Sequence, residues 1–185
     1  MISAVLDANV LYPAPIRDLL LSLADDDFFK PLWSATIQEE WKRNLLIKRH
    51  DIKPEKLERT TLLMNQAFPD AMVEDYQKWI DAISLKDPDD RHVVAIAIQA
   101  NANYIITINL KDFMGFVVPT GRFEVIHPDD FIDRLIAENP KAVYQSFEKM
   151  VLRLKNPPQS RAEVLTTLSG CGLVITAKKL KEMEA

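Results

Sequence analysis

The feature that most constrains the fold is a fully apolar run that leads into a second run rich in β-branched side chains. Every residue from Val93 to Ile98 is apolar, so a helix that begins near Pro88 must be buried on most of its sides. The string "NYIITIN" at 103–109 follows it and is typical of a central strand. A buried helix that leads into a buried strand favours an α/β fold.

The other apolar runs extend this alternation of strands and helices. Residues 2–6 predict a short buried strand, and further strands are expected at 28–33 ("FFKPLW") and 123–127 ("FEVIH"). Strands that alternate with helices imply a parallel sheet. Thr36 with Glu39 and Ser160 with Glu163 predict capping boxes. Helices are expected behind Pro15, after Ser34 or Thr36, over 54–68, from Met72 toward 83, twice within 128–155, and over the last ~25 residues.

Length and composition limit the possible classes of protein. The chain has 185 residues, which suits one main domain with an appendage. We expect an α/β domain over 1–127 and an α-helical extension over 128–185, because the character of the sequence changes beyond "FEVIH". No segment approaches the roughly 18 uninterrupted apolar residues of a membrane span. The N-terminal "MISAVLD" lacks the basic flank of a secretory signal.

Charge and cysteine content add two further limits. Cys171 is the single cysteine, which excludes an intramolecular disulfide and fits a reducing cytoplasm. The net charge is −4, so no global basic field recruits nucleic acid. A nucleic-acid enzyme of this charge would need bound cations or a local basic patch, and 42–53 is the richest basic window.

Acidic side chains gather where the predicted strands and helices should place them together. Asp7 follows the first strand, and Asn109 follows the "YIIT" strand with Asp112 three residues later. Asp90 lies in the first turn of a helix, and Glu40 lies on the core-facing side of another. Because ligands bind beyond the carboxyl ends of parallel strands, we expect these groups to meet at one edge of the sheet.

Carboxylates that converge in one cleft repel one another, and their pKa values rise unless a cation neutralises them. A hard divalent ion such as Mg²⁺ prefers oxygen ligands of this kind, and the chain offers no Cys/His cluster. Such a site can orient a water molecule, lower its pKa and offset charge on a phosphodiester. The sequence therefore predicts a site for Mg²⁺ or Mn²⁺.

Three segments together resemble a known family. "VLDANVL", "SATIQEEW" and "DPDDRHVVAIAIQANANYIITINLKDF" are similar, in that order, to the motifs of PIN domains, over residues 1 to about 127. The resemblance implies a three-layer α/β/α fold and a metal-dependent nuclease that acts on RNA. Within the family, the chain looks most like VapC-type toxins with a helical C-terminal extension. That likeness implies a separate antitoxin partner, with a homodimer as a possible assembly.

The resemblance assigns roles to individual residues. Asp7 matches the first metal-binding aspartate of the family and Asn9 the asparagine beside it, while Glu40 matches the family glutamate and Asp90 the third acid. The resemblance implies that Asp7, Glu40 and Asp90 are catalytic residues and that Asp7 and Asp90 are also metal ligands. Residues 128–185 then form either a structural extension that covers a sheet edge or builds a dimer, or a surface for the antitoxin.

The fourth acidic position departs from the family pattern. Many relatives carry Thr-x-Asp at the strand end, whereas this chain has Thr107, Ile108 and Asn109. We expect Asp112 to supply the fourth carboxylate and to act as catalytic residue and metal ligand, with Thr107 and Asn109 positioning water. A plain turn residue is the alternative for Asp112.

Other polar residues near these acids have simpler expected roles. Asp87 is placed to cap a helix that starts at Pro88, and the N-terminus of that helix should keep Asp90 ionised. Asp89 should face solvent, and His92 and His50 are expected to be ordinary polar residues. Contacts with substrate phosphates are expected from Arg43, which follows Glu40 on its helix, and from Lys42 and Arg17.

Two classes of function follow from these residues. The leading hypothesis is a Mg²⁺- or Mn²⁺-dependent endoribonuclease that is the toxin of a type II toxin–antitoxin pair. The alternative is an RNA-binding or regulatory module that kept the fold and lost efficient catalysis, which Asn109 in place of an acid supports. A phosphatase of the haloacid dehalogenase type would need a second aspartate where this chain has Asn9.

Overall fold

A four-stranded, fully parallel sheet forms the centre of the computed structural model, which describes residues 1–115 and 123–183. The strand order is β2-β1-β3-β4, so the first and third strands occupy the middle of the sheet. Their residues from Ala4 to Leu6 and at Ile105 and Ile106 are fully buried. The predicted α/β class and parallel sheet are confirmed. The strands are β1 (Ser3–Leu6), β2 (Lys30–Leu32), β3 (Tyr104–Ile106) and β4 (Glu124–Ile126).

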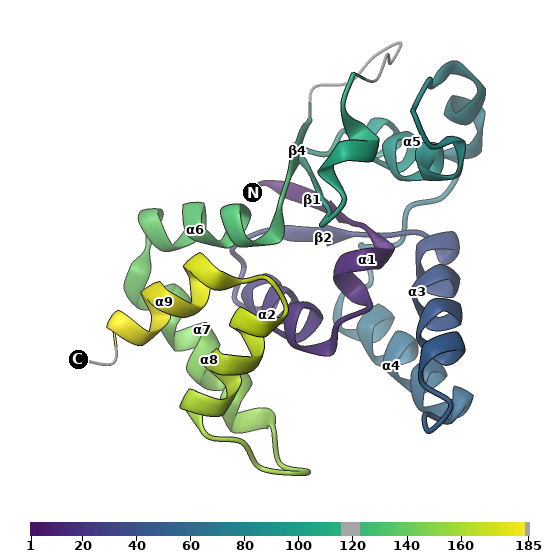
Figure 1. The fold of residues 1–185 in the computed structure, drawn as a ribbon. Helices are drawn as coiled ribbons and strands as arrows, with labels where there is room; N and C mark the ends of the chain where they lie inside the picture. Colours follow the sequence, from purple (N-terminus) through teal and green to yellow (C-terminus); the bar gives the residue numbers. More distant parts are fainter. Residues whose placement is uncertain (116–122, 184–185) are drawn as a thin grey trace.

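Helices cover both faces of the sheet. Figure 1 shows α5 on one side and α1 and α2 on the other, with α3 and α4 at one end of the molecule. The three-layer arrangement matches the expectation from the sequence. The elements of this part are α1 (Ala8–Leu11), α2 (Ala14–Asp25), α3 (Ala35–Lys48), α4 (Pro54–Ala67), η1 (Gln77–Ala82), η2 (Pro88–Asp90), α5 (Arg91–Gln99) and η3 (Leu110–Phe113).

The α5 helix is buried on most sides, as its apolar run predicts. Residues Val93 to Ala97 are at most 1% exposed, and the helix packs against β1, β3 and η1. A helix with five consecutive buried residues can exist only between other layers. The burial of α5 fixes the position of its first turn, and Asp90 directly precedes that turn.

The start of α3 differs from the prediction. Ser34 caps the helix by accepting a hydrogen bond from the Ile37 amide (3.2 Å), and the helix begins at the next residue. Thr36 therefore already lies inside the first turn, and its hydroxyl is hydrogen-bonded to the Tyr76 hydroxyl (2.7 Å). The predicted capping box between Thr36 and Glu39 is wrong, and Glu39 instead accepts a hydrogen bond from Lys42.

The helix predicted from Met72 toward residue 83 is also wrong. Met72 pairs with Trp33 as an isolated parallel bridge, and the Val73 amide donates to the Trp33 carbonyl (2.8 Å). Asp75 has a φ of 58°, in the left-handed region that an α-helix cannot pass through. Only 77–82 form a turn of 3₁₀ helix, so the apolar spacing here reflects burial of an irregular segment.

Four helices follow β4. The predicted capping box at the start of α8 is confirmed, since the Ser160 hydroxyl accepts from the Glu163 amide and the Glu163 carboxylate accepts from the Ser160 amide. Gly172, with a φ of 99°, lies in the turn between α8 and α9. Within residues 1–115 and 123–183, no helix has the length and apolar character needed to cross a membrane. The helices are α6 (Pro128–Glu138), α7 (Pro140–Arg153), α8 (Arg161–Gly170) and α9 (Val174–Glu182).

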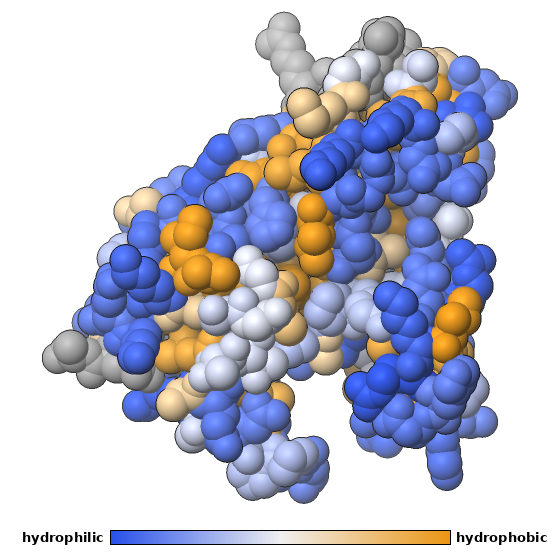
Figure 2. Space-filling view, in the orientation of Figure 1, coloured by the Kyte–Doolittle hydropathy of each residue, from blue (hydrophilic) through white to orange (hydrophobic). Residues whose placement is uncertain are grey.

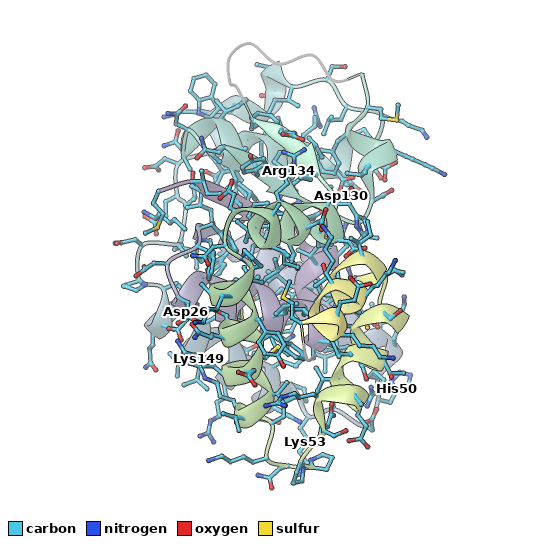
Figure 3. All side chains as sticks on the ribbon, turned by 90° about the vertical axis from the view of Figure 1, so that its left-hand side faces the viewer. Asp26, His50, Lys53, Asp130, Arg134 and Lys149 are labelled. Carbon is cyan, nitrogen blue, oxygen red and sulfur yellow. The ribbon has the colours of Figure 1, made fainter. Side chains whose placement is uncertain are left out.

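The helices α7 and α8 pack on α2, on the side that faces away from α3, while α6 packs on α7 and α9 packs on α6 and α8 (Figure 1). The Ser22 hydroxyl of α2 donates to the Ser146 carbonyl of α7 (2.9 Å). Lys149 of α7 forms an ion pair with Asp26, and Figure 3 shows these two side chains next to each other. The buried Asp129 carboxylate accepts hydrogen bonds from two amides in the first turn of α9. Polar contacts thus fix the helices to one another and to the sheet domain.

Candidate active site

A cleft of about 460 Å³ opens at the carboxyl ends of β1 and β3. Most of the acids and amides predicted for the site line it, and no residue from 123–183 is among them. Figure 2 shows a largely hydrophilic surface over α3 and the area between α3 and α1. The sheet edge therefore gathers the predicted groups. The lining residues are Asp7, Ala8, Asn9, Tyr12, Glu40, Asn44, Ile47, Lys48, Asp90 and Asn109.

Asp7 is a buried carboxylate whose oxygens are held by three donors. It follows β1 directly and caps α1, so one oxygen accepts from the Ala8 amide (2.7 Å). The other accepts from the Asn9 side-chain amide (2.7 Å) and the Thr107 hydroxyl (2.7 Å). Burial raises the pKa of Asp7, and the Thr107 hydrogen bond opposes that rise. The hydrogen bonds fix the direction of this carboxylate.

The supporting residues join the end of β3 to α1. The Asn9 amide also donates to the Thr107 hydroxyl (2.9 Å), and the Asn9 carbonyl oxygen accepts from the Ile108 amide (3.0 Å). The Asn109 amide donates to the same Thr107 hydroxyl (3.1 Å). Thr107 is fully buried. The Thr107 hydroxyl is therefore hydrogen-bonded to protein groups and helps to hold Asp7 in place. The sequence had suggested instead that Thr107 positions water.

Three aspartates form a tight group beside Asp7. Asp87, Asp90 and Asp112 each offer a carboxylate oxygen, and these oxygens all lie within 4.8 Å of one another. Asp112 comes from η3 and is hydrogen-bonded by the Asn109 side-chain amide. The placement of Asp112 agrees with its predicted role as the fourth carboxylate. A group of three carboxylates at this separation is suited to a divalent cation.

The electrostatics of Asp90 differ from the expectation. Burial, together with the negative charges of Asp7, Asp87 and Asp112, raises the pKa of Asp90 to about 7. The helix N-terminus was expected to keep this carboxylate ionised, but α5 begins only at Arg91 and the Asp90 side chain makes no capping hydrogen bond. Desolvation and like charges thus outweigh the helix dipole.

Asp87 takes part in the site, although the sequence indicated only a cap. It does cap η2 by accepting from the Asp89 amide (2.9 Å), as predicted, and Asp89 is exposed. Its carboxylate also belongs to the group with Asp90. The sequence did hold a signal for this placement, because Asp87 and Asp90 are three residues apart and this spacing brings two side chains to the same side of a helical turn.

Glu40 and His92 form a contact across the cleft that the sequence did not predict. The Glu40 carboxylate, half-buried on α3, lies 3.4 Å from His92 Nε2 in the first turn of α5. The His92 side chain is 12% exposed, and its Nδ1 has no hydrogen-bond partner among the described residues. His92 therefore holds Glu40 in place, and only its position two residues after Asp90 could have indicated this.

The three predicted phosphate-binding cations do not line the cleft. Lys42 is buried and donates to Glu39 (2.6 Å) and Glu58 (2.8 Å), so its charge is used within the protein. Arg17 is buried by α2, where it donates to the Leu11 carbonyl (3.0 Å) and stacks over the Trp41 ring. Arg43 is exposed and lies outside the cleft lining. Burial and contacts within the protein occupy the side chains of Lys42 and Arg17, so the structure lends no support to their predicted contacts with phosphates.

Comparisons with known proteins agree with this geometry. A model of the PIN domain matches residues 3–111, and a model of the VapC50 C-terminal domain matches residues 128–182. The chain is also similar to a protein of Mycobacterium tuberculosis (strain ATCC 25618 / H37Rv) that is provisionally named ribonuclease VapC50. The identity is 42% over 43 residues, which is 23% of this chain and 25% of that relative. No solved structure matches the chain significantly.

The aligned part thus spans about a quarter of the length of that curated relative. The PIN domain match is longer, covers well over half of the chain, and includes the whole sheet except β4 and every residue that lines the cleft. The predicted resemblance, including the type of C-terminal extension, is confirmed. The chain belongs to the PIN domain family.

Proposed function

We propose that the protein is a metal-dependent endoribonuclease that hydrolyses RNA phosphodiester bonds and acts as the toxin of a type II toxin–antitoxin system. The observation that carries the proposal is the group of Asp87, Asp90 and Asp112, of which Asp90 lines the cleft together with Asp7 and Glu40. Membership of the PIN domain family supports it, and so does the similarity to a relative whose provisional name is ribonuclease.

The donor set fits a hard divalent cation such as Mg²⁺ or Mn²⁺. All its ligand atoms are carboxylate oxygens, which these ions prefer over nitrogen and sulfur. The pKa of Asp90 is raised first by burial and then by the neighbouring carboxylates, and a bound cation would offset both effects. Asp90 and Asp112, with Asp87 beside them, would hold the ion, and Asp7 is the candidate ligand from the β1 side.

The chain's own residues supply the remaining chemistry. A bound cation would lower the pKa of a water molecule and offset charge on the phosphodiester. Glu40 lines the cleft and can accept a proton from the attacking water at a carboxylate oxygen. His92 orients Glu40, while Asn9 and Thr107 orient Asp7 through the hydrogen bonds to its second oxygen.

The proposed partners follow from the family resemblance. A separate antitoxin protein would neutralise the enzyme, and a homodimer is the candidate assembly. Of the described helices after residue 127, α7 and α8 pack on α2, and none of the four contributes a residue to the cleft lining. That arrangement supports a structural role for 128–183, while it leaves their outer surface available to an antitoxin or a second copy.

The test is RNA cleavage by purified protein, together with growth of cells that express it. Wild-type protein should cleave RNA with Mg²⁺ or Mn²⁺ and stop growth, and Asp7→Asn should lose both effects while it stays folded. Asp89→Asn is the matched control, since Asp89 is exposed and lies next to the acidic group without belonging to it. RNA cleavage by folded Asp7→Asn at the wild-type rate would refute the proposal.

The second candidate is a PIN-fold RNA-binding or regulatory module with weakened catalysis. Asn109 favours it, because this residue lines the cleft where many relatives carry an acid. Calorimetric titration with Mg²⁺ separates the two candidates. Saturable binding that Asp90→Asn abolishes supports the nuclease, and the absence of saturable binding supports the module.

A further inference from the structure

The wall of the cleft opposite the acids has a different chemistry. Asn44, Ile47 and Lys48 follow Glu40 by four, seven and eight residues on α3, so they share its face of the helix. Tyr12, at the end of α1, lies against them, since α1 and α3 are in contact (Figure 1). An aromatic ring, an amide, an aliphatic side chain and a cation therefore line one wall.

Lys48 is the one cation among the residues that line the cleft. Its ammonium lies over the Tyr12 ring, 5.4 Å from the ring centre. No carboxylate within the described part of the chain lies at ion-pair distance from Lys48, whereas Lys42 is paired with Glu39 and Glu58. The charge of Lys48 is thus available to a ligand.

Distance separates this cation from the acidic end of the cleft. Glu40 and Lys48 are eight residues apart on one helix, which corresponds to about 12 Å along its axis. A stacked nucleotide occupies about 3.4 Å along its strand. A stacked strand whose scissile phosphate lies at the acids therefore reaches Lys48 about three to four nucleotides further along. The cleft volume of about 460 Å³ leaves room for a nucleotide.

Resting on the proposed ribonuclease function, we propose that Tyr12 and Lys48 form a nucleotide subsite for single-stranded RNA. An unpaired base of the strand that passes the acids stacks on the Tyr12 ring, and Lys48 contacts a phosphate of the same strand. Stacking of a base on an aromatic ring is stronger than the contact of an exposed ammonium with that ring. The exposed Lys48 side chain can therefore leave the ring to the base and move to the phosphate.

The subsite also defines the class of substrate. A base that stacks on Tyr12 must be free of its own stack and its own pair, which a double helix does not allow. Stacking on one aromatic ring tolerates every base, so this subsite selects single strands and loops over duplexes. Asn44 is the residue of the same wall that can hydrogen-bond a base edge and add a sequence preference.

Fluorescence anisotropy with a labelled 12-nucleotide RNA of mixed sequence tests the subsite, in the Asp7→Asn background that separates binding from cleavage. Tyr12→Leu should weaken binding by about 5- to 100-fold at every salt concentration, and Tyr12→Phe should not. Lys48→Gln should reduce the slope of log K against log salt by about 0.7, the contribution of one phosphate contact on a single strand. Lys141→Gln, an exposed cation of α7 outside the cleft, is the control and should leave the slope unchanged.

Two further probes make the outcomes separable. An RNA with an abasic residue at the stacked position should bind more weakly than the intact RNA, by the same factor by which Tyr12→Leu weakens binding. The abasic RNA and Tyr12→Leu together should weaken binding no more than either change alone. A duplex of the same sequence should bind equally well to all variants. Wild-type affinity and salt slope in Tyr12→Leu and Lys48→Gln, or an absence of RNA binding, would overturn the subsite. Failure of the ribonuclease proposal would appear differently, as an absence of cleavage by the wild type while both variants still weaken binding.

Discussion

At the scale of single residues, neighbouring carboxylates in the cleft differ because their surroundings differ. Asp7 is 5% exposed and accepts three hydrogen bonds, which partly offset the cost of its burial. Asp90 is less buried, but four neighbouring carboxylates raise its pKa and its side chain has no capping hydrogen bond. Asp90 is therefore the group whose charge most needs a cation.

Stability should consequently depend on the ionisation of Asp90. The folded protein binds the Asp90 proton more tightly than the unfolded chain, so this group's contribution to stability is lost as pH rises from the ordinary pKa of 3.8 toward about 7. In EDTA, Asp90→Asn should melt at a higher temperature than wild type above pH 7, and the difference should close toward pH 4. Thermal unfolding followed by circular dichroism measures both.

Mg²⁺ should reverse that order. The ion binds the folded state and raises the melting temperature of wild type, while Asp90→Asn should gain little. Asp89→Asn, whose side chain is exposed, should behave as wild type in EDTA and in Mg²⁺. A wild-type melting temperature that is insensitive to Mg²⁺ would contradict the metal site.

The contact between His92 and Glu40 gives a second prediction at this scale. His92→Leu should lower kcat for RNA cleavage by about tenfold with KM nearly unchanged, because the side chain orients Glu40 and does not line the cleft. His92→Gln retains a donor and should recover part of the loss. His50→Gln, in the exposed turn after α3 (Figure 3), is the control, and equal kcat in all three variants would remove the positioning role.

Part of the site could be predicted from single residues and part could not. Asp7, Asp90 and Asn109 follow strands or start helices, and parallel topology alone brings such positions to one edge. The ion pair between Lys42 and Glu58 could not be predicted, because Glu58 comes from α4 and no local pattern predicts that contact. Lys48 was missed as a cleft residue for a related reason, since its place depends on which face of α3 meets α1.

At the scale of elements, capping decides where helices start and how they dock. Asp129 is 5% exposed, lies in the first turn of α6, and accepts from the Ile175 amide (2.9 Å) and the Thr176 amide (2.8 Å). The carboxylate of one helix thus satisfies amides at the start of another, which are otherwise without intrahelical partners. This contact fixes α9 to α6.

Asp129→Ala should therefore destabilise the protein by about 3 kcal/mol, since two hydrogen bonds to a charged acceptor are lost. Amide exchange at Ile175 and Thr176 should become faster. Urea unfolding and hydrogen exchange measure the two effects. The neighbouring Asp130 is exposed and projects from the same helix (Figure 3), so Asp130→Ala should change neither quantity, and an equal effect of both substitutions would contradict the docking role.

Element prediction succeeded where local chemistry and burial agree. The apolar run of α5 is compatible only with a buried helix, because consecutive apolar residues need to be covered on all sides. At 72–83 the apolar spacing was genuine, but the left-handed Asp75 and the bridge from Met72 to Trp33 impose an irregular path. The choice of Ser34 over Thr36 as cap was open from sequence, because both residues can cap a helix.

At the scale of the whole molecule, aromatic packing joins the last helices to the sheet. Phe131 of α6 is 1% exposed and packs edge-to-face on Phe29 (5.1 Å) and Tyr104 (5.4 Å). Tyr104 lies in β3 and Phe29 directly precedes β2. One ring therefore connects the segment after residue 127 to two strands, and we expect the chain to unfold as one unit.

Phe131→Ala should lower the free energy of unfolding by about 3 to 5 kcal/mol, as large core truncations do. The unfolding transition should stay single when it is followed by circular dichroism and by tryptophan fluorescence. Leu152→Ala is the control, because that side chain is 74% exposed and should change stability by less than about 0.5 kcal/mol. Separate transitions for the two probes would mean that the helical extension unfolds independently.

The most direct test of the central claim is the rate of RNA cleavage under single-turnover conditions as a function of Mg²⁺ concentration. Wild type and Asp89→Asn should show the same saturable dependence on Mg²⁺, and no cleavage in EDTA. Asp90→Asn should show no saturable cleavage while its circular dichroism spectrum stays that of the folded protein. Metal-independent cleavage by wild type, or wild-type rates in Asp90→Asn, would contradict the assignment of the acidic cleft as a metal-dependent ribonuclease site.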